Sequence, residues 1–260
     1  MPHTPELSLA GRHAVVTGAA QGIGAAIAHS LAAQGARLTL MGRRLDALQA
    51  MATELPGGAI AVSVDVSDEA AVQRAFAEAR TAHGPVGLLV NNAGQAESAP
   101  FGKTSLALWQ RLIAVNLTGT FLCTQQALPD MLAARHGRVV NIASTAGQRG
   151  YAYVSAYVAA KHGVVGLTRA LALEVARKGI TVNAVCPGYT ETEILSTSIA
   201  KVMASTGRSE AQARAEFEKS NPQGRIVQPI EVAAAVLWLC SDGAGALTGQ
   251  CISVSGGEVM

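Results

Sequence analysis

The chain of 260 residues has few aromatic and few charged side chains, and each scarcity excludes a class of protein. Aromatic residues make up 4% of the sequence, which argues against a surface that stacks on nucleic-acid bases. Charged residues make up 15% and hydrophobic residues 49%, a balance that excludes intrinsic disorder. The net charge of +2 provides no strongly basic surface, so we expect no nucleic-acid partner.

Cysteine is also scarce, and its spacing indicates neither a disulfide framework nor a metal site. The four cysteines are Cys123, Cys186, Cys240 and Cys251. No two of them form a Cys-x-x-Cys pair and no histidine pair flanks them, so we expect reduced thiols, no metal and a cytoplasmic location. Met1–Arg12 lacks an apolar stretch of signal-peptide length, and the absence of a long uncharged apolar run predicts no membrane span.

Short runs rich in Val, Ile and Leu alternate along the chain with longer Ala-rich segments of helical pattern. Such runs, with little polar alternation, are typical of strands buried on both faces, and the alternation predicts a parallel α/β sheet. The predicted strands are His13–Thr17, Arg37–Met41, Ala59–Val64, Gly87–Val90, Arg138–Ile142, Thr181–Val185 and Cys251–Val254. The predicted helices are Gly22–Gln34, Leu45–Glu54, Glu69–His83, Leu106–Arg135, Ala152–Lys178 and Ile230–Ser241.

No linker or shift in composition divides the chain, so we predict one domain over residues 1–260. Residues 192–228, here called the lid segment, break the alternation because they contain no predicted strand. Long excursions in compact domains are often binding elements, and we expect a helical lid over the substrate. A solvated surface helix is the alternative, since basic and acidic side chains are interspersed there. The basic residues are Lys201, Arg208, Arg214, Lys219 and Arg225.

A glycine-rich turn joins the first predicted strand to the first predicted helix. Gly18, Gly22 and Gly24 allow a tight turn and a close approach of the backbone to a ligand. The N-terminus of the following helix presents free N–H groups to an anion, so this position predicts a site for a dinucleotide pyrophosphate. The spacing is one residue longer at the front than the standard dinucleotide fingerprint.

Five further motifs follow this turn in order: Asn91-Asn92-Ala93-Gly94, Asn116, Ser144, Tyr157-x-x-x-Lys161 and Pro187-Gly188-x-x-x-Thr192. With them the chain resembles the short-chain dehydrogenase/reductase family over about Leu9 to Gly257. The resemblance implies a doubly wound Rossmann fold with strand order 3-2-1-4-5-6-7, helices on both faces and a bound NAD(H) or NADP(H). It also implies a homotetramer assembled through the two long helices and the last strand.

The choice of cofactor depends on the residue just after the second predicted strand, where an acidic side chain would bind the ribose 2′-OH of NAD. Gly42 stands there and Arg43 follows, so we expect NADP(H), with NAD(H) as the alternative. Arg43 and Arg44 could instead be surface charges at a helix start. The resemblance places the other cofactor contacts at Gln21, Ile23, Asp65, Val66, Asn92, Ala93, Gly94, Tyr157, Lys161, Pro187, Gly188, Thr190 and Thr192.

Tyr157 and Lys161 are four residues apart, on one face of a predicted helix. A phenol has a pKa near 10, and we expect the lysine and the oxidised nicotinamide to lower the pKa of Tyr157 by about three units. Tyr157 would then be a general acid in ketone reduction and a general base in alcohol oxidation. The resemblance implies that Ser144 binds the substrate oxygen and that Asn116 holds a water linking the lysine to solvent.

The substrate pocket is predicted to be apolar. The stretch Ser155–Thr168 and the long lid segment resemble the branch of 3-oxoacyl reductases and 3-hydroxybutyrate dehydrogenases. The 3-hydroxybutyrate dehydrogenases hold a free carboxylate with polar and basic groups, whereas Ala96, Ala146 and Val154 stand at the matching places here. We therefore expect a 3-oxoacyl or 3-hydroxyacyl thioester, carried on CoA or an acyl carrier, or a similar apolar carbonyl compound. The predicted pocket residues are Gln95, Ala96, Ser144, Ala146, Val154, Tyr189, Ile194 and Leu195.

Three alternatives remain at this stage. A broad carbonyl reductase and an NAD-dependent dehydrogenase of secondary alcohols or hydroxy acids would use the same residues. A cofactor-binding regulator without catalysis is the third, although such relatives usually lack the tyrosine or the lysine.

Overall fold

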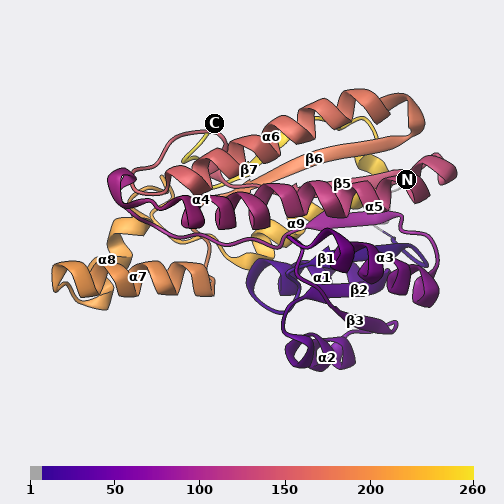
Figure 1. The fold of residues 1–260 in the computed structure, drawn as a ribbon, viewed down its shortest axis with the longest axis horizontal. Coiled ribbons are helices and arrows are strands. Elements are labelled where there is room, and N and C mark those ends of the chain that lie inside the picture. The colour runs from indigo at the N-terminus through magenta and orange to yellow at the C-terminus, as the bar shows by residue number, and fades with distance from the viewer. Residues whose placement is uncertain (1–7) are drawn as a thin grey trace, which may run out of the picture.

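The structure, a computed structural model that describes residues 8–260, is built around a seven-stranded parallel sheet (Figure 1). The strand order β3-β2-β1-β4-β5-β6-β7 confirms the predicted doubly wound fold. The strands are β1 His13–Thr17, β2 Arg37–Gly42, β3 Ala59–Ser63, β4 Leu88–Asn91, β5 Gly137–Ile142, β6 Ile180–Pro187 and β7 Cys251–Val254. The prediction on Met1–Arg12 lies mostly outside the described residues.

Nine helices are found in residues 8–260, apart from short 3₁₀ turns and one π turn. They are α1 Gly22–Ala33, α2 Leu45–Glu54, α3 Glu69–His83, α4 Leu106–Ile113, α5 Gly119–Ala134, α6 Ser155–Val175, α7 Glu193–Thr206, α8 Glu210–Glu218 and α9 Pro229–Cys240. Successive residues of a strand point to opposite faces of the sheet, and each face has its own core. Val16 packs with α1, α2 and α9, whereas its neighbour Val15 packs with α3, α5 and α6.

The predicted long helix Leu106–Arg135 is interrupted. α4 and α5 are joined by a π turn over residues 114–118, and the fully buried Asn116 lies within it. Its Nδ2 donates to the carbonyl oxygens of Leu112 and Gln95, both at 2.9 Å. Widened turns of this kind frequently occur at functional sites, and this one directs a polar side chain toward the loop after β4.

The same stretch, Leu106–Ala134, is the one part of residues 8–260 that is long and apolar enough to cross a membrane by length and composition. Residues 112–129 of this stretch are uncharged, but Asn116, Gln125, Gln126 and three threonines interrupt them, so they do not form a continuous apolar run. Leu122 and Met131 of this stretch are buried in the core beneath the sheet. Asp130 accepts hydrogen bonds from Arg80 Nε at 2.8 Å and from the backbone of Val86 at 2.9 Å.

The lid segment forms α7 and α8, which project beyond the sheet (Figure 1). The chain returns to where it left the sheet, because Thr190 and Val227 form an isolated parallel bridge. The Glu191 N–H donates to Val227 O at 2.9 Å, and the Val227 N–H donates to Tyr189 O at 3.0 Å. Buried apolar side chains join the two helices to the chain below them: Leu195, Ile199, Ala213 and Ile226.

Candidate active site

A cavity of about 1350 Å³ lies beyond the carboxyl ends of β1, β4, β5 and β6, with α7 along one side. In open α/β sheets this edge, where the strand order reverses, is where ligands bind. Every residue predicted to contact cofactor or substrate lines this cavity, with the exception of Gly24. The structure therefore brings together, in one cavity, predicted site residues that lie as far apart in the sequence as Gly18 and Leu195.

The glycine-rich turn is shaped by close packing. Gly18 and Gly22 have φ of +64° and +55°, which favour glycine. A Cβ on Gly24 would lie 2.2 Å from the carbonyl oxygen of Gly18, so Gly24 allows helix and turn to approach each other behind the cavity. Asn92 fixes the turn from β4, because its Nδ2 donates to the carbonyl oxygens of Thr17 and Gly18, both at 3.0 Å.

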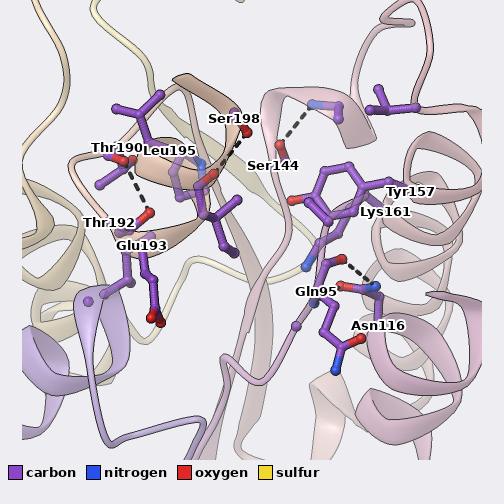
Figure 2. A pocket seen from close by; sticks show the side chains of 18 of the residues that line it. Gln95, Asn116, Ser144, Tyr157, Lys161, Thr190, Thr192, Glu193, Leu195 and Ser198 are labelled. Atoms are coloured by element: carbon purple, nitrogen blue, oxygen red, sulfur yellow. Dashed lines mark hydrogen bonds between the residues drawn. The ribbon is translucent and has the colours of Figure 1, made fainter. Parts of the chain in front are cut away.

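The residues predicted to be catalytic lie on one side of the cavity, and Figure 2 shows Tyr157 between Ser144 and Lys161. Ser144 follows β5, whereas Tyr157 and Lys161 lie one turn apart on α6. Lys161 is 4% exposed; its Nζ donates to Ile142 O at 2.8 Å and lies 5.6 Å from the centre of the Tyr157 ring. Across the cavity, Figure 2 shows Thr190 just before the lid segment and Thr192 and Leu195 at its start.

The expected lowering of the Tyr157 pKa is wrong for the protein's own groups. Burial raises the pKa of this phenol, and the neighbouring Ser144 hydroxyl offsets part of the rise. The Lys161 ammonium group donates its hydrogen bond to the carbonyl of Ile142 and not to the phenol. Burial also lowers the pKa of Lys161 to about 8, because its cation is removed from water.

Asn116 and Lys161 approach each other at Gly94. A Cβ on Gly94 would lie 2.8 Å from Asn116 Oδ1 and 3.6 Å from Lys161 Nζ, so a larger residue would press on both groups. Asn116 Oδ1 also accepts from the backbone N–H of Gln95 at 3.2 Å. The π turn thus places an amide beside the lysine, where the resemblance implied a water-holding asparagine.

The far end of the cavity carries the groups expected at an adenosine. Asp65 accepts hydrogen bonds from the Ser67 backbone at 2.9 Å and from the Ser67 hydroxyl at 2.6 Å, and that hydroxyl holds the pKa of Asp65 below its usual value. Arg43 and Arg44 line the same end and are exposed. Among residues 8–260, no group of three or more His, Cys, Asp or Glu side chains could hold a metal ion.

Aromatic side chains, among them the predicted Tyr157 and Tyr189, form one wall of the cavity. All four tyrosines of the chain line it, in a protein with 4% aromatic residues. The ring of Tyr189 packs edge-on against Tyr151 at 6.5 Å and against Phe217 of α8 at 4.8 Å, measured between ring centres. The Tyr151 hydroxyl lies 2.7 Å from Glu258 Oε1 and 2.8 Å from Thr145 Oγ1. Phe217 and Glu258 were not predicted, because they are distant in sequence from the tyrosines that they contact.

Comparison with known proteins assigns the family. The family model described as short chain dehydrogenase matches residues 12–202, and the chain belongs to this family of oxidoreductases, which bind NAD or NADP and act on alcohol or ketone groups. The chain is 43% identical over 249 residues to ketoacyl reductase 1 of the granaticin polyketide synthase from Streptomyces violaceoruber, with 94% of this chain and 92% of that protein covered.

Two further relatives agree with this assignment. The 3-oxoacyl-(acyl-carrier-protein) reductase of Aquifex aeolicus is 36% identical over 256 residues, which cover 97% of this chain and 99% of that protein. A crystal structure of a variant of the actinorhodin polyketide ketoreductase with NADPH superposes with a TM-score of 0.92 at 40% identity. It covers 95% of this chain and 97% of that one.

Proposed function

We propose that the protein is an NADP(H)-dependent reductase of 3-oxoacyl thioesters. The observation that carries the proposal is the cavity itself, which has hydroxyl groups of Tyr157 and Ser144 at its centre and Arg43 at one end. Ala96 and Val154, which also line the cavity, carry no charge. Such a cavity suits a neutral carbonyl compound beside a phosphorylated dinucleotide.

The residues present fit a dinucleotide with a 2′-phosphate. A Cβ on Gly18 would lie 2.9 Å from the Cα of Ala93, so only glycine leaves this part of the cradle open. The free N–H groups at the start of α1 would hold the pyrophosphate, and Arg43 with Arg44 would hold the 2′-phosphate. When bound, the reduced cofactor supplies a hydride to the substrate carbonyl carbon.

Side chains of the protein supply the proton that ketone reduction requires. Because burial raises its pKa, Tyr157 is protonated at neutral pH and can donate its phenolic proton to the ketone oxygen. The Ser144 hydroxyl would donate a hydrogen bond to the same oxygen as negative charge develops there. The ammonium group of Lys161, one helical turn from Tyr157, would stabilise the phenolate that remains. In alcohol oxidation Tyr157 takes the proton back.

The uncharged side chains near the substrate favour a thioester over a free acid. Ala96, Ala146 and Val154 offer no cation for a carboxylate, and an unpaired charge there would be costly to bury. Two relatives support the same substrate class by their names. They are the granaticin ketoacyl reductase and the Aquifex 3-oxoacyl-(acyl-carrier-protein) reductase.

The test is a comparison of acetoacetyl thioester, acetoacetate and a simple ketone of similar size, each assayed with NADPH by the absorbance of the reduced nicotinamide. We expect kcat/KM for the thioester to exceed the other two by at least about tenfold, the effect of one well-made contact. Equal values for thioester and simple ketone would contradict the proposal and favour a broad carbonyl reductase.

The rate of reduction should depend on pH through Lys161. Its pKa of about 8 means that the ammonium form predominates below pH 8 and the neutral amine above it. We expect kcat/KM for reduction to be level below that pH and to fall by about tenfold per pH unit above it, because the phenolate loses its neighbouring cation. Circular dichroism at each pH controls for unfolding. A profile that stays level to about pH 10, the ordinary range for lysine, would contradict this role.

A further inference from the structure

A second, smaller hollow opens from the substrate end of the cavity. It has a volume of about 360 Å³ and is here called the side groove. It shares Gln95, Val154 and Ile194 with the main cavity, so the two are continuous. Glu97 and Thr197 line the groove alone, which places it between the loop after β4 and α7.

α7 presents one face to the side groove. Ile194, Thr197, Ser198 and Lys201 are spaced as i, i+3, i+4 and i+7, the pattern of side chains on one side of a helix. Seven residues of helix rise by about 10 Å, so Lys201 stands well outward from Ile194. The groove is therefore a channel that begins at the substrate and ends beside a lysine.

Lys201 differs from the other basic residues of the lid segment. Arg208, Lys219 and Arg225 reach carboxylates at 3.2, 3.1 and 2.6 Å, and Arg214 reaches Glu218 at 3.1 Å. Lys201 has no ion-pair partner within residues 8–260, and it lines both the cavity and the groove.

The two carboxylates that line the side groove already have partners within the protein. Glu97 forms an ion pair with Arg111, and Glu193 accepts a hydrogen bond from Gln21. The cations that line the groove are Arg43, which is assigned to the cofactor, and Lys201. A bound anion would give Lys201 the partner that the protein does not supply.

We propose that the side groove holds the arm of the thioester substrate and that Lys201 binds its phosphate. The inference rests on the proposed function: a thioester whose keto group lies at Tyr157 must direct its sulfur substituent out of the cavity. CoA and acyl carriers both attach the acyl group to the sulfur of phosphopantetheine, which has a phosphate at its other end. The groove lies beside the cofactor residues Gln21 and Arg43, and Lys201 is the one of its two cations that is not assigned to the cofactor.

The experiment compares three acetoacetyl thioesters with NADPH. The N-acetylcysteamine ester carries no phosphate, the phosphopantetheine ester carries one, and the CoA ester carries that phosphate and those of the nucleotide. In Lys201→Gln we expect KM for the two phosphorylated esters to rise about tenfold, the value of one charged hydrogen bond. The KM for the N-acetylcysteamine ester, the KM for NADPH and all kcat values should stay within about twofold, because the proposal gives Lys201 no contact with the carbonyl group or with the cofactor.

Two variants serve as controls. Lys219→Gln removes a lysine of the same lid segment that is paired with Glu216, and it should leave all three KM values unchanged. Lys201→Arg keeps the charge and should restore most of the affinity. A rise with both phosphorylated esters assigns Lys201 to the phosphate shared by CoA and carriers, whereas a rise with CoA alone assigns it to the nucleotide phosphates and to CoA as donor.

Other results would overturn the inference. If Lys201→Gln leaves KM for both phosphorylated esters unchanged, or raises KM equally for all three esters, Lys201 does not bind phosphate. If the unsubstituted enzyme reduces simple ketones but none of the thioesters, the proposed function itself is wrong and the groove has no such ligand. The two failures are distinguishable because the first leaves thioester reduction by the unsubstituted enzyme intact.

Discussion

Tyr157→Phe should lower kcat for ketone reduction by about a thousandfold, the usual contribution of a positioned general acid. The substitution removes the one phenolic hydroxyl that lies between Ser144 and Lys161, and water or Ser144 would have to supply the proton instead. The ring itself remains, so the apolar contacts of Tyr157 with the α4 residues Leu108 and Leu112 should persist. The measurement is NADPH consumption with the acetoacetyl thioester at saturating concentration.

Tyr153→Phe is the matched control for this substitution. Tyr153 also lines the cavity, but its side chain is 66% exposed, and loss of its hydroxyl should change kcat by less than about twofold. NADPH binding, followed by the fluorescence of the reduced nicotinamide, should be within about twofold of normal in both variants, since neither loses a charge. Near-normal turnover in Tyr157→Phe would contradict the proton-donor role.

Gly42→Asp should shift the preference from NADPH toward NADH by about a hundredfold in the ratio of the two kcat/KM values. An aspartate at the end of β2 would repel a 2′-phosphate and accept hydrogen bonds from a 2′-OH. The site can take the side chain, because a Cβ on Gly42 would meet the Leu48 methyl groups at 3.6 and 3.8 Å, ordinary contact distances. The expected factor corresponds to two charged interactions of about tenfold each.

Gly42→Asn separates charge from size, since it has the same shape and no negative charge. We expect it to change the ratio by less than about tenfold, because it has no charge with which to repel the 2′-phosphate. Arg43→Ala should weaken NADPH binding without improving the use of NADH. An unchanged NADPH preference in Gly42→Asp would show that Arg43 and Arg44 are surface charges and that selectivity is decided elsewhere.

The fold and the positions of the site residues could be predicted because they follow from short-range patterns. Apolar runs separated by helical segments define the order of a parallel sheet, and residues that end its strands, such as Ser144 after β5, must gather at one edge. The spacing of Tyr157 and Lys161 fixes their common helix face in the same way. Differences at helix ends have local causes: α6 begins at Ser155 because Tyr153 has a φ of +67°.

Other parts of the site depend on contacts between distant segments. Glu258 reaches Tyr151 only because the tail after β7 folds across the sheet edge, and no spacing in the sequence encodes that approach. The interruption at Asn116 arises from hydrogen bonds to the loop after β4. The pKa of Tyr157 is raised by burial, and the spacing of Tyr157 and Lys161 in the sequence does not show how deeply the phenol is buried.

The bridge between Thr190 and Val227 has a consequence for how this enzyme can diversify. The chain leaves the sheet edge at Thr190 and returns beside it at Val227. The helices between them, α7 and α8, are therefore an insertion whose two ends lie side by side. Changes in their length or sequence add little loop-closure entropy and leave the strand register intact. A different substrate can therefore be accommodated by changing this one insertion, while the hydroxyl groups of Ser144 and Tyr157 stay on a rigid scaffold.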